Sequence, residues 1–94
     1  MTTPEIELIY FDGCPNADRA RDNLRAAVNQ SSEDLEWSEW NLMAESTPER
    51  YRQHGSPTVL VNGRDVTGEE HPVAAMACRA DGAPSVDTIA AALL

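Results

Sequence analysis

The sequence predicts a single α/β domain built on a four-stranded mixed sheet with helices on both faces. Its 94 residues suit one domain, because chains divide only at considerably greater length. Strand-like and helix-like segments follow one another in the order β-α-β-α-β-β-α. A crossover helix makes the first two strands parallel and adjacent. The closing hairpin is expected to join the same sheet, because an isolated hairpin is only marginally stable.

The first strand and helix are expected on either side of Cys14. Residues 6–11 are almost continuously apolar, which is typical of a central strand covered on both faces. Asp12 and Gly13 end this strand, and Pro15 suits a first helical position, where its missing N–H needs no partner. Apolar residues then recur at helical spacing, with charged residues on the other faces. We therefore expect Cys14 at the N-terminus of the first helix.

A second strand and a short helix are expected next. In residues 35–42 the alternation breaks between Trp37 and Trp40, which predicts a bulge or an edge position. The two tryptophans either pack at that edge or form a contact surface. Residues 46–49 then combine a cap, an N-terminal proline and a capping-box acid, as at the start of a helix that ends near His54.

The last part of the chain predicts a hairpin and a final helix. Residues 57–61 and 64–66 flank an Asn-Gly pair at 62–63, which is a strong hairpin signal. A longer irregular segment from Thr67 to Pro84 contains Cys78. Ser85 is expected to cap a helix with an apolar face formed by Val86, Ile89, Ala90 and Leu93.

The charge balance argues against two classes of partner. Seven basic and sixteen acidic residues give a net charge of −9. Nucleic acids and anionic membranes both attract positive surfaces, so we expect neither as a partner. No apolar run approaches the roughly 20 residues of a membrane span, and the first five residues lack the basic region of a secretory signal. The expected location is the cytoplasm, where cysteines stay reduced unless they take part in redox chemistry.

Three segments carry a resemblance to a known family: residues 10–16, 55–66 and 77–79. In this order they resemble a group of short bacterial thioredoxin-like proteins, often labelled thioredoxin family or alkylmercury-lyase-like. The resemblance covers nearly the whole chain and implies a thioredoxin-like fold. In that fold a cis-proline precedes the third strand and faces the cysteine, and Ser56-Pro57 matches its position.

The chain departs from the redox-active thioredoxins at one position. Those proteins carry Cys-x-x-Cys, whereas this chain reads Cys14-Pro15-Asn16-Ala17. The resolving thiol of that motif is absent, which excludes ordinary dithiol chemistry through it.

Cys14 is the candidate nucleophile. Unpaired N–H groups and the positive end of a helix dipole favour a thiolate at its predicted position, and we expect Asn16 and Ala17 to direct N–H groups toward the sulfur. Asp12, Asp18 and the net charge act in the opposite direction. The alternative is a buried, inert cysteine.

Cys78 is the candidate resolving partner of Cys14. The fourth strand is expected to end on the same side of the sheet as Cys14, so the following loop can bring Cys78 to it. The alternative places Cys78 in a short helical turn of the core. Two neighbouring thiols could also bind a soft metal ion such as Cu(I) or a mercurial, with His71 as a weak third ligand. No spacing of a structural zinc site is present.

The leading hypothesis is thiol–disulfide exchange through Cys14, with Cys78 as a possible resolving thiol. The substrate would be a small thiol or a protein disulfide, held by Pro15, Asn16, Pro57 and Thr58. If Cys78 lies far away, a monothiol route through a mixed disulfide replaces the pair.

Two other functions are compatible with the residues. One is a soft-metal or organomercurial binding protein that uses both thiols. The other is a non-catalytic binding module that uses the groove or a Trp37/Trp40 surface. No phosphate loop, nucleophile elbow or metalloprotease motif occurs, so we expect no cofactor; the oligomeric state is left open.

Overall fold

A computed structural model of the protein describes residues 4–31, 35–68 and 83–93, without the side chain of Gln53. Its elements in chain order are β1 (Ile6–Tyr10), α1 (Ala17–Gln30), β2 (Trp37–Asn41), the 3₁₀ helix η1 (Glu49–Gln53), β3 (Thr58–Val61), β4 (Arg64–Asp65) and α2 (Val86–Ala92). The predicted order of strands and helices is confirmed, with a 3₁₀ helix in place of the second α-helix.

The strands of the described residues form one four-stranded mixed sheet in the order β2-β1-β3-β4. β1 pairs parallel with β2 and antiparallel with β3, and β3 pairs antiparallel with β4. β2 therefore lies at an edge, which confirms one of the two expectations for this strand. Its register with β1 runs without interruption from Ile6–Trp37 to Tyr10–Asn41, so the other expectation, a bulge, is wrong for this pairing.

The predicted hairpin is confirmed at Asn62-Gly63. Both residues have positive φ angles, 54° and 82°, as the type I′ form of a two-residue hairpin turn requires. Asn tolerates this conformation and Gly adopts it without a steric penalty. β4 ends at Asp65, one residue earlier than expected.

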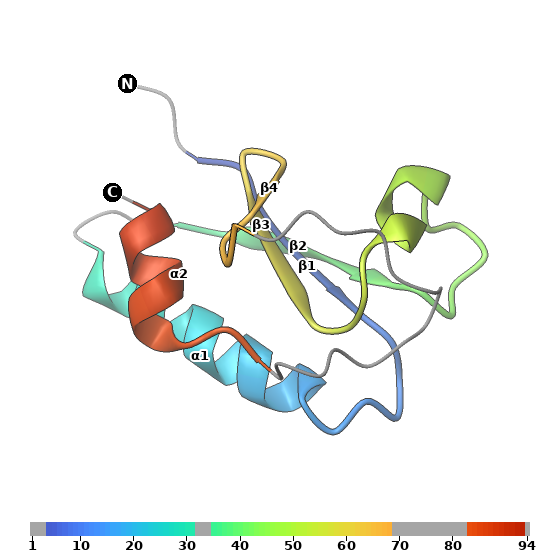
Figure 1. Ribbon diagram of the computed structural model, residues 1–94, viewed down its shortest axis with the longest axis horizontal. Helices are drawn as coiled ribbons and strands as arrows, with labels where there is room; N and C mark the ends of the chain where they lie inside the picture. The colour runs from blue at the N-terminus through green and yellow to red at the C-terminus, as the bar shows by residue number, and fades with distance from the viewer. Residues whose placement is uncertain (1–3, 32–34, 69–82, 94) are drawn as a thin grey trace.

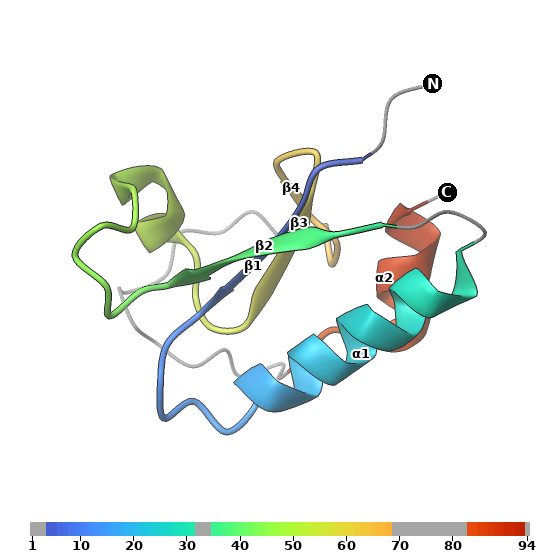
Figure 2. The same ribbon diagram turned by 180° about the vertical axis from the view of Figure 1, so that it is seen from behind.

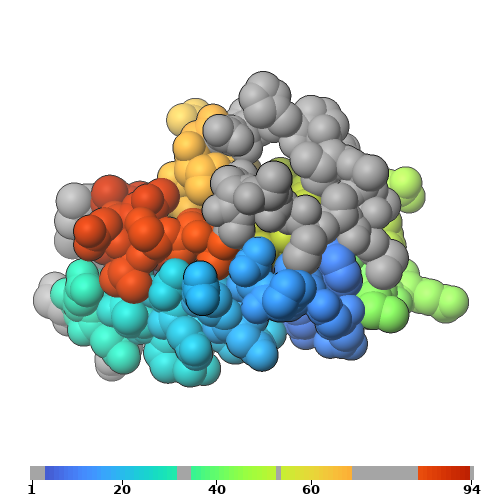
Figure 3. Space-filling view, turned by 60° about the horizontal axis from the view of Figure 1, so that its bottom comes forward, coloured from blue at the N-terminus to red at the C-terminus, as the bar shows by residue number. Residues whose placement is uncertain are grey.

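The prediction of helices on both faces of the sheet is only partly correct. Both described α-helices lie on the same face, side by side (Figures 1 and 2). Figure 3 shows α2 lying along α1 at the surface. The opposite face is covered by η1, where Tyr51 packs with Ile9, Leu42 and Leu60. The sequence of η1, Glu-Arg-Tyr-Arg-Gln, offers a single large apolar side chain, which is too little to form the apolar face of an α-helix.

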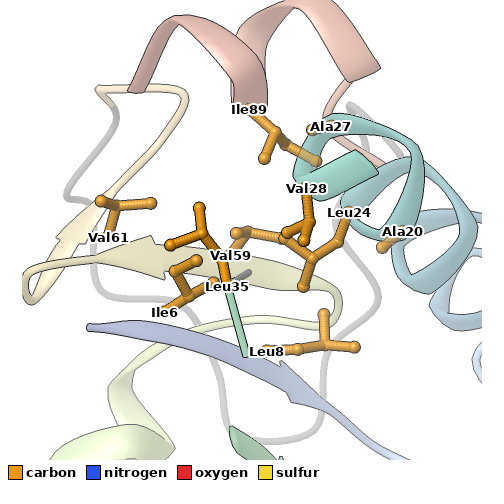
Figure 4. Packing of buried hydrophobic residues seen from close by; sticks show 10 residues of the cluster. All are labelled: Ile6, Leu8, Ala20, Leu24, Ala27, Val28, Leu35, Val59, Val61 and Ile89. Atoms are coloured by element: carbon orange, nitrogen blue, oxygen red, sulfur yellow. The ribbon is translucent and has the colours of Figure 1, made fainter. Parts of the chain in front are cut away.

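The main core lies between the sheet and the two helices. β1 contributes Ile6 and Leu8 to this layer, and its alternate residue Ile9 points to the η1 side. Figure 4 shows the side chains from β1, β3, α1 and α2 converging on one another. The buried residues of this cluster are Ile6, Leu8, Ala20, Leu24, Ala27, Val28, Leu35, Val59, Val61 and Ile89.

The two helix starts differ in how well the sequence predicted them. Ser85 caps α2 as expected, and its hydroxyl accepts a hydrogen bond from the Thr88 N–H at 3.1 Å. α1 begins at Ala17 with Asn16 as its cap, two residues after the expected start at Pro15.

No helix within the described ranges has the length and apolar character needed to cross a membrane.

Leu24 tests the packing of α1 on the sheet. It is fully buried, so Leu24→Ala is expected to lower the free energy of unfolding by about 2–5 kcal/mol through lost burial and a residual cavity. Urea denaturation followed by circular dichroism measures this change. The matched control is Met43→Ala, because Met43 is 54% exposed and its truncation is expected to cost less than about 0.5 kcal/mol. Equal losses in the two variants would contradict the described core.

Candidate functional site

Cys14 lies in the turn that joins β1 to α1, as the sequence predicted. Gly13 has a φ of 93°, which allows the chain to reverse directly after the strand. The backbone N–H of Cys14 donates to the carbonyl oxygen of Phe11 at 3.3 Å, and its own carbonyl accepts from the Ala17 N–H at 3.1 Å. These two hydrogen bonds fix the backbone of Cys14, and its side chain is buried, with 7% exposed.

The Ala17 N–H does not make the contact with the Cys14 sulfur that the sequence predicted. Cys14 precedes the first helical residue by three positions, because α1 starts at Ala17. The N–H of Ala17 is used by the carbonyl oxygen of Cys14, so the prediction that it points to the sulfur is wrong. In a helix that started at Pro15, the Ala17 N–H would have had no backbone partner, whereas in the observed turn it donates to the carbonyl oxygen of Cys14.

The Ser56-Pro57 turn meets the Cys14 turn. The peptide bond between Ser56 and Pro57 is cis, which confirms the prediction made from the resemblance. The Ser56 hydroxyl accepts a hydrogen bond from the Phe11 N–H at 3.3 Å. The sulfur of Cys14 lies 3.6 Å from the carbonyl oxygen of Ser56. The structure therefore brings together two segments of the predicted site that are distant in sequence.

The four residues predicted to hold a substrate differ in exposure. Pro57 and Thr58 are almost completely buried, and the Thr58 hydroxyl donates to the carbonyl oxygen of Gly55 at 2.7 Å. Pro15 is exposed and Asn16 is half-buried. Pro15 and Asn16 are thus accessible at the surface, and the role of all four residues in substrate binding stays a prediction.

The second half of the predicted site is the pairing of Cys14 with Cys78, with His71 as a weak third metal ligand. Cys14 is disulfide-bonded and is not a free thiol in this structure. Cys78 and His71 lie outside the described residues. The Cys14–Cys78 pairing and the soft-metal site built from it therefore stay predictions. Within the described parts of the chain, no group of three or more His, Cys, Asp or Glu side chains could hold a metal ion.

A pocket of about 230 Å³ opens beside Cys14. It is lined by the residues of the turn and by the first part of α1, including Asp18 and Arg21. Arg21 makes a bidentate ion pair with Glu39 of β2, its Nη1 is 2.9 Å from Asp18, and its guanidinium lies 5.0 Å above the centre of the Tyr10 ring. These contacts fix the guanidinium against the rim of the pocket.

The charged side chains that line the Cys14 pocket each make a hydrogen bond or an ion pair. The hydrogen bond with Glu39 raises the pKa of Arg21, and the same bond lowers the pKa of Glu39 below its ordinary value of 4.5. Arg21 is thus balanced by two carboxylates. Asp12, which is exposed, accepts a hydrogen bond from the Asn41 side chain at 3.1 Å. The lining of the pocket contains Asp12 and Asp18 against Arg21, so it carries more acidic than basic groups, as expected from the sequence.

The two tryptophans do not form one surface. Trp37 packs against the core on the helix side of the sheet, and its indole donates to Glu39 at 3.0 Å. Trp40 packs on the opposite face, where its ring stacks on Tyr51. A joint Trp37/Trp40 contact surface is thus contradicted, because the residues project from opposite faces of an edge strand. Both are half-buried, in agreement with packing at the edge.

Sequence reasoning missed two groups. The first is the Ser56 hydroxyl, which ties the two turns together. The second is Glu7, a buried carboxylate that contacts Trp40 and Tyr51. An acidic residue inside an apolar strand was the available signal for Glu7, because a buried charge requires partners.

Comparison with known proteins adds no relative. The chain has no significant match to a family model, a curated protein or a solved structure. Its resemblance to thioredoxin-like proteins rests on the three sequence segments alone.

Glu39 gives a pH-dependent test of the ion pair at the pocket. Its pKa is lowered in the folded chain, so its stabilisation is fully present above pH 4.5 and is lost as the pH falls through the folded pKa. Both partners are partly exposed, so Glu39→Gln is expected to lower the free energy of unfolding at pH 7 by about 0.2–1 kcal/mol. This difference from wild type is expected to shrink below pH 4.5 in urea titrations. Glu36→Gln, at an exposed neighbour, serves as the control, and a pH-independent loss in Glu39→Gln would contradict the ion pair.

Proposed function

We propose that this protein is a thioredoxin-like thiol protein that exchanges disulfides through Cys14. The observation that carries the proposal is the position of the Cys14 sulfur, 3.6 Å from the carbonyl oxygen that precedes cis-Pro57. The sheet order β2-β1-β3-β4, with α1 connecting parallel strands β1 and β2, supports the same topology. The fold alone does not define an activity, so the proposal depends on this local geometry.

The proposed reaction begins with the thiolate of Cys14. It attacks one sulfur of a substrate disulfide, the S–S bond breaks, and the other sulfur leaves as a thiolate. Cys14 is then held in a mixed disulfide with the first half of the substrate. The substrate disulfide is the oxidant: it accepts two electrons, which come from Cys14 and Cys78 in the two-cysteine route and from Cys14 and then the external thiol, with Cys14 restored, in the monothiol route.

The second step releases the remaining half of the substrate. In the two-cysteine route, the thiolate of Cys78 attacks the sulfur of Cys14, and the substrate half leaves as a thiolate while the Cys14–Cys78 disulfide forms. In the monothiol route, a small external thiolate attacks the substrate sulfur of the mixed disulfide instead; a new disulfide forms between the external thiol and the substrate half, and Cys14 leaves as a thiolate. Both routes require a reduced Cys14 at the start.

The surroundings of Cys14 set its reactivity at a moderate level. In the reduced protein, the thiol can donate to the Ser56 carbonyl oxygen, which orients the sulfur toward the turn at Pro57. That oxygen and the nearby carboxylates of Asp12 and Asp18 oppose the negative charge of a thiolate. We therefore expect exchange with small disulfides without the strong activation of a thiol beside a cation.

The proposal predicts the products of mild oxidation. The reduced wild-type protein, treated with oxidised glutathione and then denatured and alkylated, is expected as a monomer that has lost two hydrogens and has no alkylated cysteine. Cys78→Ser is expected to retain one glutathione at Cys14, because the resolving thiol is missing. Intact-mass spectrometry distinguishes these species.

Cys14→Ser is the matched control for this experiment. It is expected to give much less glutathione adduct than Cys78→Ser, because the proposal assigns the attack on the disulfide to Cys14 and not to Cys78. Two freely alkylated thiols in the treated wild type would contradict the proposed exchange. A glutathione adduct that persists in the wild type would instead favour the monothiol route.

A further inference from the structure

A second pocket lies on the face of the sheet that carries η1, separate from the Cys14 pocket. Its volume is about 370 Å³, within the range of small-molecule sites, and it shares no lining residue with the pocket at Cys14. Polar groups from three parts of the chain line it: the start of β1, the region of η1 and the Asn62-Gly63 turn. The polar residues are Glu5, Glu7, Arg50, Tyr51, His54 and Asn62.

Glu7 places a carboxylate deep in this pocket. The residue is only 5% exposed. One carboxylate oxygen, Oε2, accepts hydrogen bonds from the Trp40 indole at 2.8 Å and from the Tyr51 hydroxyl. The rings of Trp40 and Tyr51 stack with their centres 4.8 Å apart, which holds both donors in position. The carboxylate is therefore fixed by two aromatic side chains.

The other oxygen of Glu7 has no hydrogen-bond partner among the described residues. Among residues 4–31, 35–68 and 83–93, Oε1 makes no hydrogen bond, and no fully enclosed side-chain oxygen in these ranges lacks a partner. Oε1 is therefore not fully enclosed, and Glu7 is one of the residues that line the pocket. A largely buried carboxylate with one open oxygen is a strong acceptor for a cationic donor such as an ammonium group.

Arg50 supplies the positive charge of the same pocket. Its guanidinium lies 4.8 Å above the centre of the Tyr51 ring, on which Trp40 is also stacked, and its Nη2 donates to the Tyr51 hydroxyl at 2.9 Å. Its other donor atoms, Nε and Nη1, have no hydrogen-bond partner in the described part of the chain. Asn62 adds an amide whose oxygen accepts from the Glu5 N–H at 3.0 Å.

We propose that this pocket binds a small α-amino acid as its zwitterion. The ammonium group would donate to Oε1 of Glu7, and the carboxylate would accept from Arg50 and the side-chain amide of Asn62. The pocket supplies charges of both signs, which complements a ligand that carries both. Two glutamates against one arginine disfavour ligands with an acidic side chain.

The indole N–H resonances of Trp40 and Trp37 report on binding in this pocket. The Trp40 indole is bonded to Glu7, whereas the Trp37 indole is bonded to Glu39 on the other face of the sheet. Titration with L-norleucine, followed by ¹H–¹⁵N correlation spectra, is expected to shift the Trp40 indole resonance saturably in the millimolar range and to leave the Trp37 resonance in place. Trp37→Phe assigns the two resonances.

Two analogues each remove one charge of the probe. n-Pentylamine lacks the carboxylate of norleucine, and hexanoate lacks its ammonium group. Each is expected to bind roughly tenfold more weakly or worse. Binding of n-pentylamine as tight as that of norleucine would overturn the proposal in favour of a simple cation site.

Substitutions then test the two charged groups. Glu7→Gln is expected to weaken norleucine binding roughly tenfold or more, while Glu49→Gln, an exposed neighbour that does not line the pocket, leaves it unchanged. Arg50→Gln, at an exposed side chain, is expected to weaken norleucine but not n-pentylamine, and it keeps the test decisive if Glu7→Gln does not fold. Unchanged binding in both variants, equal shifts of the two indoles, or no shift at all would overturn the proposal.

Discussion

The hydrogen bond from the Phe11 N–H to the Ser56 hydroxyl joins the two turns on which the candidate thiol site depends. β1 and β3 are antiparallel neighbours, and their pairing ends with Ile9 opposite Thr58. Beyond that pair the two chains separate, and the Ser56 side chain continues the contact that the strand ladder no longer provides. The Cys14 sulfur lies 3.6 Å from the carbonyl oxygen of the same Ser56. The environment of Cys14 is thus a consequence of sheet register as much as of the residues beside it.

β1 serves both faces of the molecule. Ile6 and Leu8 pack into the main core under the two helices, while Glu7 and Ile9 face η1. A carboxylate on the second face is tolerated because Trp40 and Tyr51 both donate to it, so its burial is compensated by hydrogen bonds. The same strand therefore ends at the candidate thiol site and carries, on its η1 face, the carboxylate of the proposed amino-acid pocket.

The sequence predicts those parts of the structure that depend on local patterns. Residues 6–11 indicated a buried strand, the Asn62-Gly63 pair indicated a hairpin, and Ser85 indicated a helix cap, because each signal lies within a few residues. The neighbourhood of Cys14 and Ser56-Pro57 was predicted through a family resemblance. Arrangements that depend on distant residues were not predictable in this way. The placement of both α-helices on one face and the contact of Glu7 with Tyr51 are decided by tertiary packing, which no local pattern encodes.

The central claim is that Cys14 takes part in disulfide exchange in the folded arrangement of the two turns. The most direct test is the rate at which the Cys78→Ser variant, with Cys14 as its single thiol, forms a mixed disulfide with the uncharged hydroxyethyl disulfide. The rate is measured by mass spectrometry in buffer and again in urea that unfolds the chain. We predict that the folded protein forms the mixed disulfide at a rate within about tenfold of that of the unfolded chain, because the groups around Cys14 activate its thiol only moderately. A folded protein that forms no mixed disulfide while the unfolded chain reacts would show that Cys14 is a buried structural cysteine and would contradict the proposed function.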